Sequence, residues 1–534
     1  MASRMRSRMS YLRSSGFLLA VLFLAAGCFK VGPDFVKPEA AVMPNWLEAE
    51  GYKQVSTKAD EYRDWWRSFN DPVMDKLVQS AYQQNLGLRI AGVRVLGARA
   101  QLGAATGQLF PQAQQATGLV QKNRLSEKSP LAPPGTPGNF WVTQLGMTAS
   151  WEIDFWGKFR RAIESADAGL MAAVADYDNA LVSLTGDVAN AYVSIRTLEK
   201  RLDIARQNVL IQKKSLQIAT ARWKGGTTSR RDVEQALTVL ESTEATIPPL
   251  ESQLRQTKNA LCVLMGMPPS DLGETLGPKA GNIPVPPPTV ALGMPAELLR
   301  RRPDIQAAEW RAAAQCAQIG VSKASLFPAF SFSGNIAFQA GDVGSVMLAD
   351  MFQWRSRTGS FGPAFQWNIL NYGQITNLVR VQDAKFQELL IAYQNTVLQA
   401  QQEVENSLIA FLKAQEQAER LAASTAAAQR SVGLAILQYR EGITDFTTVI
   451  TAEQTLLTQQ DNLASSLGNI SSNLVGMYRA MGGGWQIREG HDFLPDAVKE
   501  AMAKRTNWGK LLTPAAIPEP RSEKPRRDVR APDW

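Results

Sequence analysis

The sequence repeats itself at a nearly constant offset, and this duplication constrains the fold more than any other feature. The tripeptide Leu109–Pro111 returns as Leu326–Pro328, an offset of 217 residues. Other identities return at an offset of 216: Trp151, Gly157, Gly226, Val233 and Met265–Gly266 recur as Trp367, Gly373, Gly442, Val449 and Met481–Gly482. A fixed period over more than about a hundred residues indicates two copies of one structural unit.

The repeat also divides the chain into segments. We expect a signal peptide at 1–27, a lipidated N-terminal segment at 28–75, a first copy at 76–267, a proline-rich linker at 268–295, a second copy at 296–483, and a C-terminal segment at 484–534. The last residues, 511–534, mix prolines with charges of both signs and are expected to be disordered.

Each copy contains one very long helical pattern. Apolar residues recur at alternating steps of three and four from Tyr177 to Trp223 and again from Tyr393 to Tyr439. Such heptads are typical of helices that pack along their whole length. No proline interrupts these stretches, so each helix can extend over about 67 residues, or about 100 Å.

Glycines end both long patterns. At Gly226 and Gly442 the periodicity breaks and a second helical segment returns, which predicts a helical hairpin in each copy. Pro248–Pro249 interrupts the first returning segment, whereas Ala464–Ser465 stand at the equivalent place in the second. Because proline removes a helical hydrogen bond, the two hairpins are not interchangeable.

A period of two replaces the helical period between the first helix and the long helix of each copy. Alternating apolar residues predict strands around 145–153, 330–338 and 361–369, with four strands in all and one apolar, aromatic-rich face. Strands of about ten residues suit a lipid bilayer. The alternative is a β-sandwich that buries the apolar faces in its own core.

The first 28 residues resemble the export signal of a bacterial lipoprotein. Four arginines and no acid precede the apolar run Gly16–Leu24, and Ala25–Cys28 then looks like a lipobox. The resemblance implies cleavage before Cys28 and acylation of this residue, and Phe29 in place of aspartate favours passage to the outer membrane. The alternative is an ordinary signal peptide in which Cys28 is incidental.

Composition narrows the function further. The formal charge of +8 falls to +4 without the four arginines of the leader, too little to predict binding to nucleic acid. One histidine, His491, and three cysteines make a metal cage or a histidine-based catalytic triad hard to assemble. We therefore expect neither an enzyme nor a cofactor apart from the lipid on Cys28, and we expect Cys262 and Cys316 to be ordinary buried residues.

Strand arithmetic favours an oligomer. Beyond the leader there is no uninterrupted apolar stretch of about 18 residues, so any crossing of a membrane would use strands. Four strands cannot close, and an open sheet edge in hydrocarbon leaves backbone groups unpaired. Two chains give eight strands with a filled interior, whereas three give twelve with room for a solute. We predict a homotrimer with a 12-stranded transmembrane β-barrel, continued by a long α-helical coiled-coil barrel.

A series of short motifs completes the picture. They are Cys28 with Val31–Phe35 and Pro38, Trp65–Trp66 with Phe69–Pro72, Ala98–Ala100, Leu109–Pro111, Asp154–Gly157, Leu299–Ile305 and Gly482–Trp485. Together they resemble the outer-membrane efflux lipoproteins of the OprM and NodT type, relatives of the TolC exit duct. The resemblance implies that the barrel lies in outer-membrane lipid and that the helical barrel is a long periplasmic tunnel. It also implies a passive channel that works with a periplasmic adaptor and an inner-membrane transporter of the resistance-nodulation-division class. A type I protein-secretion duct is the alternative, which the lipobox disfavours.

The same resemblance implies a periplasmic gate just after the turn that contains Gly442. Family members often carry aspartates there, which form an acidic ring. This sequence has Thr448 and Thr451 instead, with Asp445 nearer the tip and Glu453 beyond, which implies a weaker or displaced acidic gate.

The turn tyrosine gives a second gate prediction. Asp232 stands where relatives have an aspartate bonded to that tyrosine, so Asp232 and Tyr439 are candidates for a latch that holds the channel shut. The alternative is that both are ordinary helix-surface groups.

Two other motifs allow a functional and a structural interpretation. Arg300–Arg302 could form a docking patch, but a helix start beside a linker favours a structural boundary with solvated charge. Trp65–Trp66 and Trp156 are interpreted as packing or interface anchors in preference to sugar-binding platforms.

Overall fold

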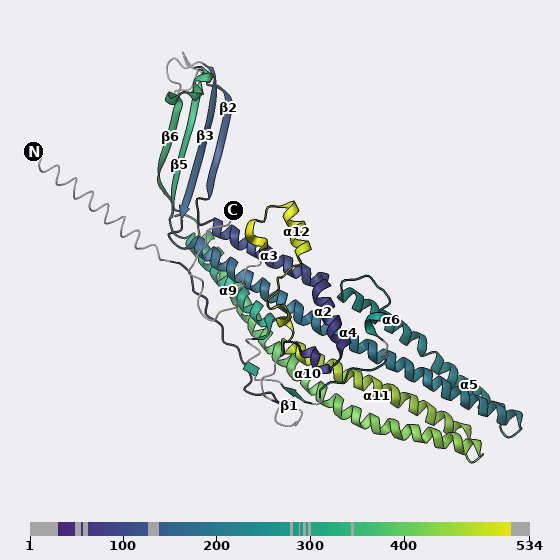
Figure 1. Cartoon of the computed structure of the whole chain (residues 1–534). Coiled ribbons are helices and arrows are strands. Elements are labelled where there is room, and N and C mark those ends of the chain that lie inside the picture. Colours follow the sequence, from purple (N-terminus) through teal and green to yellow (C-terminus); the bar gives the residue numbers. More distant parts are fainter. Residues whose placement is uncertain are drawn as a thin grey trace, which may run out of the picture.

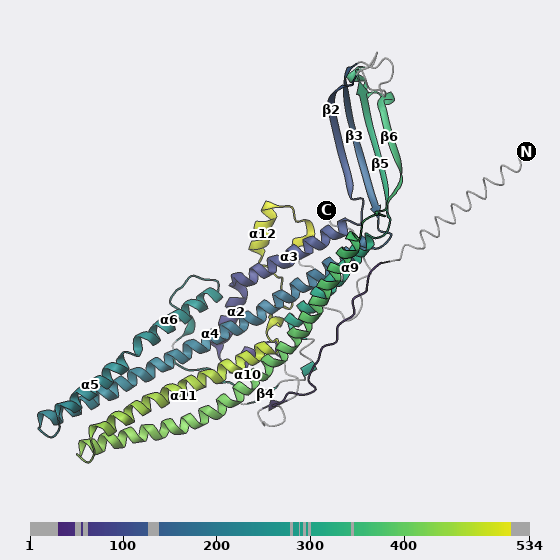
Figure 2. The same ribbon diagram turned by 180° about the vertical axis from the view of Figure 1, so that it is seen from behind.

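The computed structural model describes residues 30–48, 55–56, 62–126, 138–277, 281–287, 289–291, 295–296, 301–342 and 347–513. The predicted signal peptide, Cys28 and the tail from residue 514 lie outside the described residues. A four-stranded sheet stands at one end of a long bundle of helices (Figure 1), and the view from behind shows the same arrangement (Figure 2).

The sheet joins the two copies. Its strands are β2 (Ala113–Arg124), β3 (Asn139–Ile153), β5 (Ala329–Gly341) and β6 (Arg357–Gln366). All neighbours are antiparallel and the order is β2-β3-β5-β6, so β3 of the first copy pairs with β5 of the second. The outer edges of the sheet are therefore β2 and β6 (Figure 1).

One face of this sheet is apolar and open. Residues opposite each other on paired strands share a face, and Met147 lies opposite Ile336 while Trp151 lies opposite Phe332. Met147 is 61% exposed and Phe361 is 82% exposed. The described part of the chain therefore does not bury this face, contrary to the β-sandwich alternative.

The last strand ends earlier than predicted. The alternating pattern extended it to Ile369, but β6 ends three residues before that position. Trp367 instead donates its indole N–H to the carbonyl of Leu326, at 3.0 Å. The equivalent indole of the first copy, Trp151, makes the same bond to Leu109 at 3.2 Å. Each tryptophan thus ties the foot of its strand to the end of the helix that precedes the sheet.

The two long helices are confirmed, each with 67 residues. They are α4 (Lys158–Lys224) and α10 (Gln374–Arg440). Their starting points are 216 residues apart, and each follows a glycine in the left-handed conformation, with φ of 78° at Gly157 and 82° at Gly373. Glycine adopts this conformation without a steric cost, so it allows the sharp change of direction from strand to helix.

The returning helices differ between the copies, as the prolines predict. Helix α4 is followed by α5 (Arg230–Glu244) and, after a break, by α6 (Ile247–Leu264), with Pro248–Pro249 in the first turn of α6. In the second copy α11 (Phe446–Ala480) runs uninterrupted along α10. Proline is tolerated in the first turn of a helix because the N–H groups there have no partner within the helix.

Shorter helices complete each copy. In the first copy α2 (Pro72–Gln84) leads into α3 (Leu86–Gly107), and in the second copy the counterpart of α3 is α9 (Pro303–Ala324). Helices α3 and α9 each have 22 residues and start 217 residues apart. Helix α9 packs between α4 and α10, whereas α3 packs against α4.

Several small elements connect these helices and strands. They are β1 (Val55–Ser56) paired with β4 (Val290–Ala291), the single-turn helices η1 (Trp65–Phe69), η2 (Leu348–Phe352), η3 (Trp354–Ser356), η4 (Trp485–Arg488) and η5 (Gly509–Leu512), and the helices α7 (Gly273–Leu276) and α12 (Asp496–Arg505).

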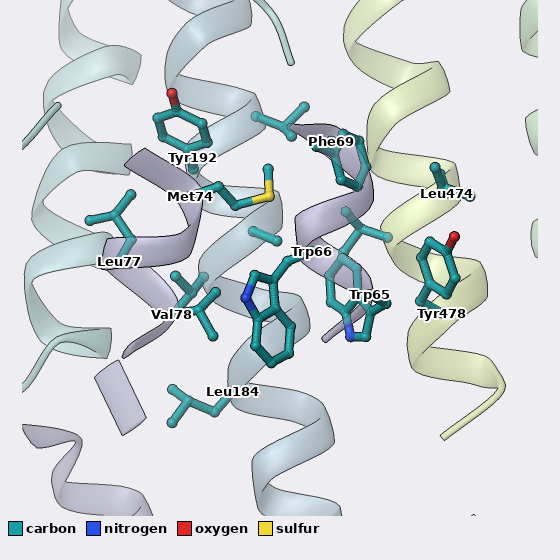
Figure 3. Packing of buried hydrophobic residues seen from close by; sticks show 14 of the residues in the cluster. Trp65, Trp66, Phe69, Met74, Leu77, Val78, Leu184, Tyr192, Leu474 and Tyr478 are labelled. Carbon is teal, nitrogen blue, oxygen red and sulfur yellow. The ribbon is translucent and has the colours of Figure 1, made fainter. Parts of the chain in front are cut away.

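The largest hydrophobic cluster lies where η1 and α2 pack against α4 and α11 (Figure 3). Trp66 is fully buried there, and its indole N–H donates to Asp75 at 2.7 Å. Trp65 stacks on Tyr478 with 5.2 Å between ring centroids. Both tryptophans are therefore packing residues, as predicted, and neither offers a ring face to a sugar.

Residues 30–48 form an extended strap along the helices. The strap begins on α4, where Arg161, only 1% exposed, donates to the carbonyls of Val31 and Gly32 at 3.2 and 3.1 Å. Farther along, the Gln401 side chain accepts from the N–H of Met43 and donates to the main chain at position 41, both at 2.9 Å. The helices thus hold the strap by its backbone.

The C-terminal segment is folded as far as residue 513, although its sequence has no helical periodicity. Arg488 makes two bonds to the buried carboxylate of Asp178 on α4, one of them at 2.7 Å. Phe493 packs edge-on against Tyr177, with 4.9 Å between centroids. Burial raises the pKa of Asp178 to about 6, although its bonds to Arg488 oppose that rise.

The arginine motif before α9 is a structural boundary. Arg302 is 8% exposed and donates to the Glu403 carboxylate and the Ala480 carbonyl, each at 2.7 Å. Arg301 lies over an aromatic ring at 4.8 Å. These contacts contradict an exposed docking patch at Arg302, and Arg300 lies outside the described residues.

Cys262 and Cys316 are buried and unbonded to each other, as predicted. Among the residues that the structure describes, no helix is long and apolar enough to cross a bilayer. The same residues contain no cluster of three or more metal-ligating side chains.

Candidate channel and gate

The tips of the two helical hairpins lie side by side at the end of the molecule farthest from the sheet (Figures 1 and 2). Both turns use a glycine in the left-handed conformation, with φ of 72° at Gly226 and 79° at Gly442. The N–H of the residue after each glycine bonds back to the helix, to Arg222 in one case and to Gln438 in the other, at 3.0 and 2.9 Å. This arrangement caps both helices in the same way.

The structure brings the predicted latch residues together. The Tyr439 hydroxyl donates to the Asp232 carboxylate at 3.2 Å, and this bond joins the end of α10 to the start of α5. Thr228 donates to the same carboxylate oxygen. Tyr439 is 3% exposed and its ring packs against Phe446 at 4.9 Å. These contacts contradict the alternative in which both residues are simple surface groups.

The protonation state of the latch suits this bond. Burial raises the pKa of the Tyr439 hydroxyl above its ordinary value, while the neighbouring Thr228 hydroxyl opposes that rise. A hydroxyl with a raised pKa keeps its proton at physiological pH, so Tyr439 remains the donor in its bond to Asp232.

The sequence pattern does not predict the role of a third residue at the tip. Arg222, in the last turn of α4, donates to the main-chain carbonyls of Tyr439 and Arg440, the second at 3.4 Å. Its guanidinium also lies 4.6 Å from the centroid of the Tyr439 ring. The positive charge therefore lies beside carbonyls at the C-terminal end of α10, where the helix dipole favours a cation.

The other predicted gate residues form a separate group on α11. Asp445 is the N-cap of this helix, and its carboxylate accepts from the N–H and the hydroxyl of Thr448 at 3.1 and 3.0 Å. Thr451 donates to the carbonyl of Thr447 at 2.9 Å. Because Asp445 is committed to capping, its charge is partly used within its own helix.

Threonines continue along the exposed face of α11. The exposed residues Thr448, Thr451, Thr455 and Thr458 follow steps of three and four, which places them on one side of the helix. Thr451, Thr455 and Thr458 each donate to the carbonyl four residues earlier, at 2.7 to 2.9 Å. The face that relatives are expected to line with acids is therefore neutral here and presents methyl groups and hydroxyl oxygens.

Glu453 does not belong to this face. It is 2% exposed, lies between α11 and α4, and accepts a hydrogen bond from the hydroxyl of Ser215. Burial raises the pKa of its carboxyl group, although the bond from Ser215 acts in the opposite direction. Glu453 therefore adds no carboxylate to the exposed face of α11.

The model of the outer membrane efflux protein family matches residues 77–267 and 294–483 of this chain. Nodulation protein T of Rhizobium leguminosarum bv. trifolii is 29% identical over 81% of this chain and 89% of its own length. The toluene efflux pump outer membrane protein TtgC of Pseudomonas putida is 28% identical over 89% of this chain and 96% of its own length.

Solved structures agree with this match. The outer-membrane channel OprN superposes with a TM-score of 0.78 at 32% identity, and the match covers 86% of this chain and 100% of OprN. The open state of the Neisseria gonorrhoeae MtrE outer membrane channel superposes with a TM-score of 0.71 over 85% of this chain and 98% of MtrE. Its identity of 24% supports the fold alone.

These matches confirm the predicted fold class, a trimeric outer-membrane barrel with four strands per chain above a long helical barrel. They also confirm the predicted function and location, because the relatives are outer membrane components of efflux pumps. The protein is a channel and not an enzyme, a statement that rests on its relatives. With both copies of the repeat matched by one family model, this chain belongs to the outer membrane efflux protein family.

Proposed function

We propose that this protein is a passive homotrimeric duct for drugs or other small solutes, with a gate at the hairpin tips. A periplasmic adaptor and an inner-membrane transporter, of the resistance-nodulation-division class, would deliver the solute and supply the energy. The observation that carries the gate is the bond between Tyr439 and Asp232, since it ties two hairpins that must separate if the tip is to widen.

The contacts around the latch support a closed state in this structure. Tyr439 and Asp232 are both buried, at 3% and 6% exposed. Opening the tip would break the hydrogen bond between them, and each group would then have to form a hydrogen bond with water. A single such bond contributes about 0.5–1.5 kcal/mol net, a scale that an adaptor binding nearby can overcome.

The threonine face defines the character of the constriction. With Thr448 and Thr451 on the exposed side of α11 and Asp445 bonded to Thr448, the gate would present no ring of free carboxylates. A neutral ring attracts cations less strongly than an acidic ring does. We therefore infer weak cation selectivity for this channel.

The choice of solute is assigned to the transporter. Relatives of this chain are named for nodulation, for toluene efflux and for pyoverdine export. Proteins so similar over most of their length serve cargoes of different chemistry, which favours selection before the cargo reaches the duct. Cross-linking in intact cells should recover an adaptor with this chain, and a chain that is recovered alone would contradict the tripartite assembly.

We also propose that Cys28 is the acylated N-terminal residue of the mature protein. The strap starts at residue 30 near the base of the sheet, where Arg161 holds Val31 and Gly32 (Figure 1). The first described residues of the strap therefore lie near the strand ends, which supports an anchor on the residues that precede them. Mass spectrometry of the mature N-terminus should show a lipid-modified cysteine, and an unmodified Cys28 would refute the anchor.

The gate is tested by conductance in planar bilayers. Tyr439→Phe removes only the hydroxyl, and Asp232→Ala removes its acceptor. A loss of about 1 kcal/mol should raise the ratio of open to closed channels about fivefold in either variant. Because both substitutions remove the same bond, the double variant should open little more than the single ones.

A matched control lies on the same helix as Asp232. Glu234 is exposed and pairs with Arg230 within α5, so Glu234→Ala removes a carboxylate without touching α10. This variant should conduct like the natural chain. Natural conductance in both latch variants would refute the latch, and equal opening in Glu234→Ala would show that loss of any acid near the tip has the same effect.

A further inference from the structure

We propose that Tyr372 of one protomer packs against Phe110 and Pro111 of the next protomer at the foot of the barrel. The proposal rests on the trimeric channel described above. The proposal specifies which residues, and which strand register, join one chain to the next. We infer them from the internal repeat: the structure shows how the first copy contacts the second within one chain, and the same contacts are expected between the second copy of one chain and the first copy of the next.

The junction inside the chain is an aromatic clasp. Trp156, which follows the end of β3, stacks on Phe327 with 4.6 Å between ring centroids and 26° between planes. Its indole N–H also donates to the carbonyl of Pro328 at 2.8 Å. This clasp fastens the last strand of the first copy to the chain that leads into the first strand of the second copy.

The counterparts of these residues are present but separated. The offset of 216 relates Trp156 to Tyr372, and the offset of 217 relates Phe327 to Phe110. In one chain they lie beyond β6 and before β2, at opposite edges of the sheet (Figure 1). Tyr372 is 95% exposed and Phe110 is 37% exposed. They can therefore meet only between two copies of the chain.

The backbone at Tyr372 points to the same conclusion. Its φ of 47° is one of two positive values among the described non-glycine residues. The left-handed region is uncommon for a residue with a bulky side chain and costs free energy. No contact within the described chain compensates for this cost at so exposed a ring, whereas a contact with a neighbouring protomer would.

The helices beneath the sheet repeat the pattern. Helix α9 fits between α4 and α10, and Gly320 there allows close approach, since a Cβ would meet the Arg161 side chain at 2.8 Å. The counterpart of Gly320 in α3 is Gly103, which has nothing within 4 Å. Exposed apolar residues of α10, Leu378, Val381 and Ile391, are available to cover it from the next protomer.

The strand register between chains can be worked out. Ala113 pairs with Ser150 and Ala329 pairs with Gln366, so the two hairpins correspond at an offset of 216. Within the chain Ala149 pairs with Gly334. The same offset turns this pair into Phe365 of one protomer opposite Gly118 of the next. Both residues then share the outer, apolar face, because partners on adjacent strands point the same way.

Disulfide cross-linking tests the register in purified trimers. The double variant Phe365→Cys with Gly118→Cys should give covalent trimers on a denaturing gel without reductant, since three bonds close a ring. The control Phe365→Cys with Leu119→Cys is slipped by one residue and places the thiols on opposite faces, so it should stay monomeric. Each single variant should also stay monomeric, because Cys262 and Cys316 are buried and the lipid proposed on Cys28 blocks that thiol.

The outcomes separate this proposal from the trimer itself. Cross-linking in the slipped pair and not in the predicted pair would overturn the register. If light scattering in mild detergent shows that the natural chain is monomeric, the trimeric channel fails and the junction fails with it. A trimer that does not cross-link at the predicted pair refutes the junction alone.

A second measurement isolates the clasp. Tyr372→Ala and Phe110→Ala should each lower the temperature at which trimers dissociate in detergent, and the double variant should lower it no further. Tyr372→Trp, which restores the residue type of the in-chain clasp, should retain the natural value. The control Phe352→Ala removes a ring that is 75% exposed outside the proposed junction. If Tyr372→Ala behaves like this control, the clasp is refuted even where the register holds.

Discussion

Arg222 offers a sharp test of how the tip stays closed. Substituting alanine removes a guanidinium that binds the carbonyls of Tyr439 and Arg440 and covers the Tyr439 ring. A cation–π contact at a partly exposed site contributes about 0.5–1 kcal/mol, and a cation at a helix C-terminus contributes about 0.3–1 kcal/mol. The hydrogen bonds to the carbonyls add about 1 kcal/mol, since water can replace them in part.

These contributions overlap, so about 2 kcal/mol is a reasonable total for closure. At about 1.4 kcal/mol per tenfold change, Arg222→Ala should raise the open-to-closed ratio about 30-fold for each protomer. Arg222→Lys retains the charge but loses the planar fork, and it should fall between alanine and the natural residue. Single-channel recording in planar bilayers measures the ratio directly.

Lys224 provides the matched control. It stands in the same last turn of α4, is exposed, and makes no hydrogen bond or ion pair with α10 within the described part of the chain. Lys224→Ala should therefore gate like the natural protein. The reasoning fails if Arg222→Ala leaves the open probability unchanged while Asp232→Ala raises it, because the clamp would then be irrelevant to closure. Equal effects from Lys224→Ala would indicate that net charge at the tip matters and the clamp geometry does not.

Two further predictions concern the helical body. Because burial raises the pKa of Glu453, its carboxyl binds a proton more readily in the folded than in the unfolded chain. Stability is therefore highest below the unfolded pKa and falls as pH rises through the folded pKa. Glu453→Gln should raise Tm at neutral pH and flatten the dependence of Tm on pH in circular dichroism melts, and a lowered Tm would contradict this. Gln401→Ala removes both hydrogen bonds to residues 41–43, so limited proteolysis should cut the strap faster than in the natural chain. The control Gln402→Ala changes an exposed neighbour and should not speed the cutting. Equal rates in the two variants would show that other contacts hold the strap.

Much of the fold can be predicted from local sequence patterns. The long helices can be predicted because no proline interrupts their heptads before Gly226 and Gly442. The break before α6 can be predicted because Pro248–Pro249 interrupts a helical pattern. Strand β2 has no clear apolar alternation, so it is recognisable only as the partner that a hairpin requires. The fold of the C-terminal segment cannot be predicted in this way, because Arg488 and its neighbours fold by packing on α4, a contact distant in sequence.

The gate residues likewise divide into those that the sequence predicts and those that it does not. The Asp232–Tyr439 pair follows from a family resemblance, and the structure brings the two residues together. The sequence pattern puts Glu453 two positions beyond Thr451, about 200° around the helix, and this difference in direction is why Glu453 faces α4. It gives no sign of the role of Arg222 because a basic residue in the last turn usually caps its own helix, whereas here it caps a neighbouring one.

The break between α5 and α6 has a mechanical consequence for the assembled tube. Around its circumference, jointed hairpins from the first copy must alternate with straight hairpins from the second copy. The periplasmic end of the tube is therefore a ring in which three stiff hairpins alternate with three more flexible ones. Widening of such a ring has threefold symmetry, and a ring of six identical subunits bound to it would meet two different binding surfaces.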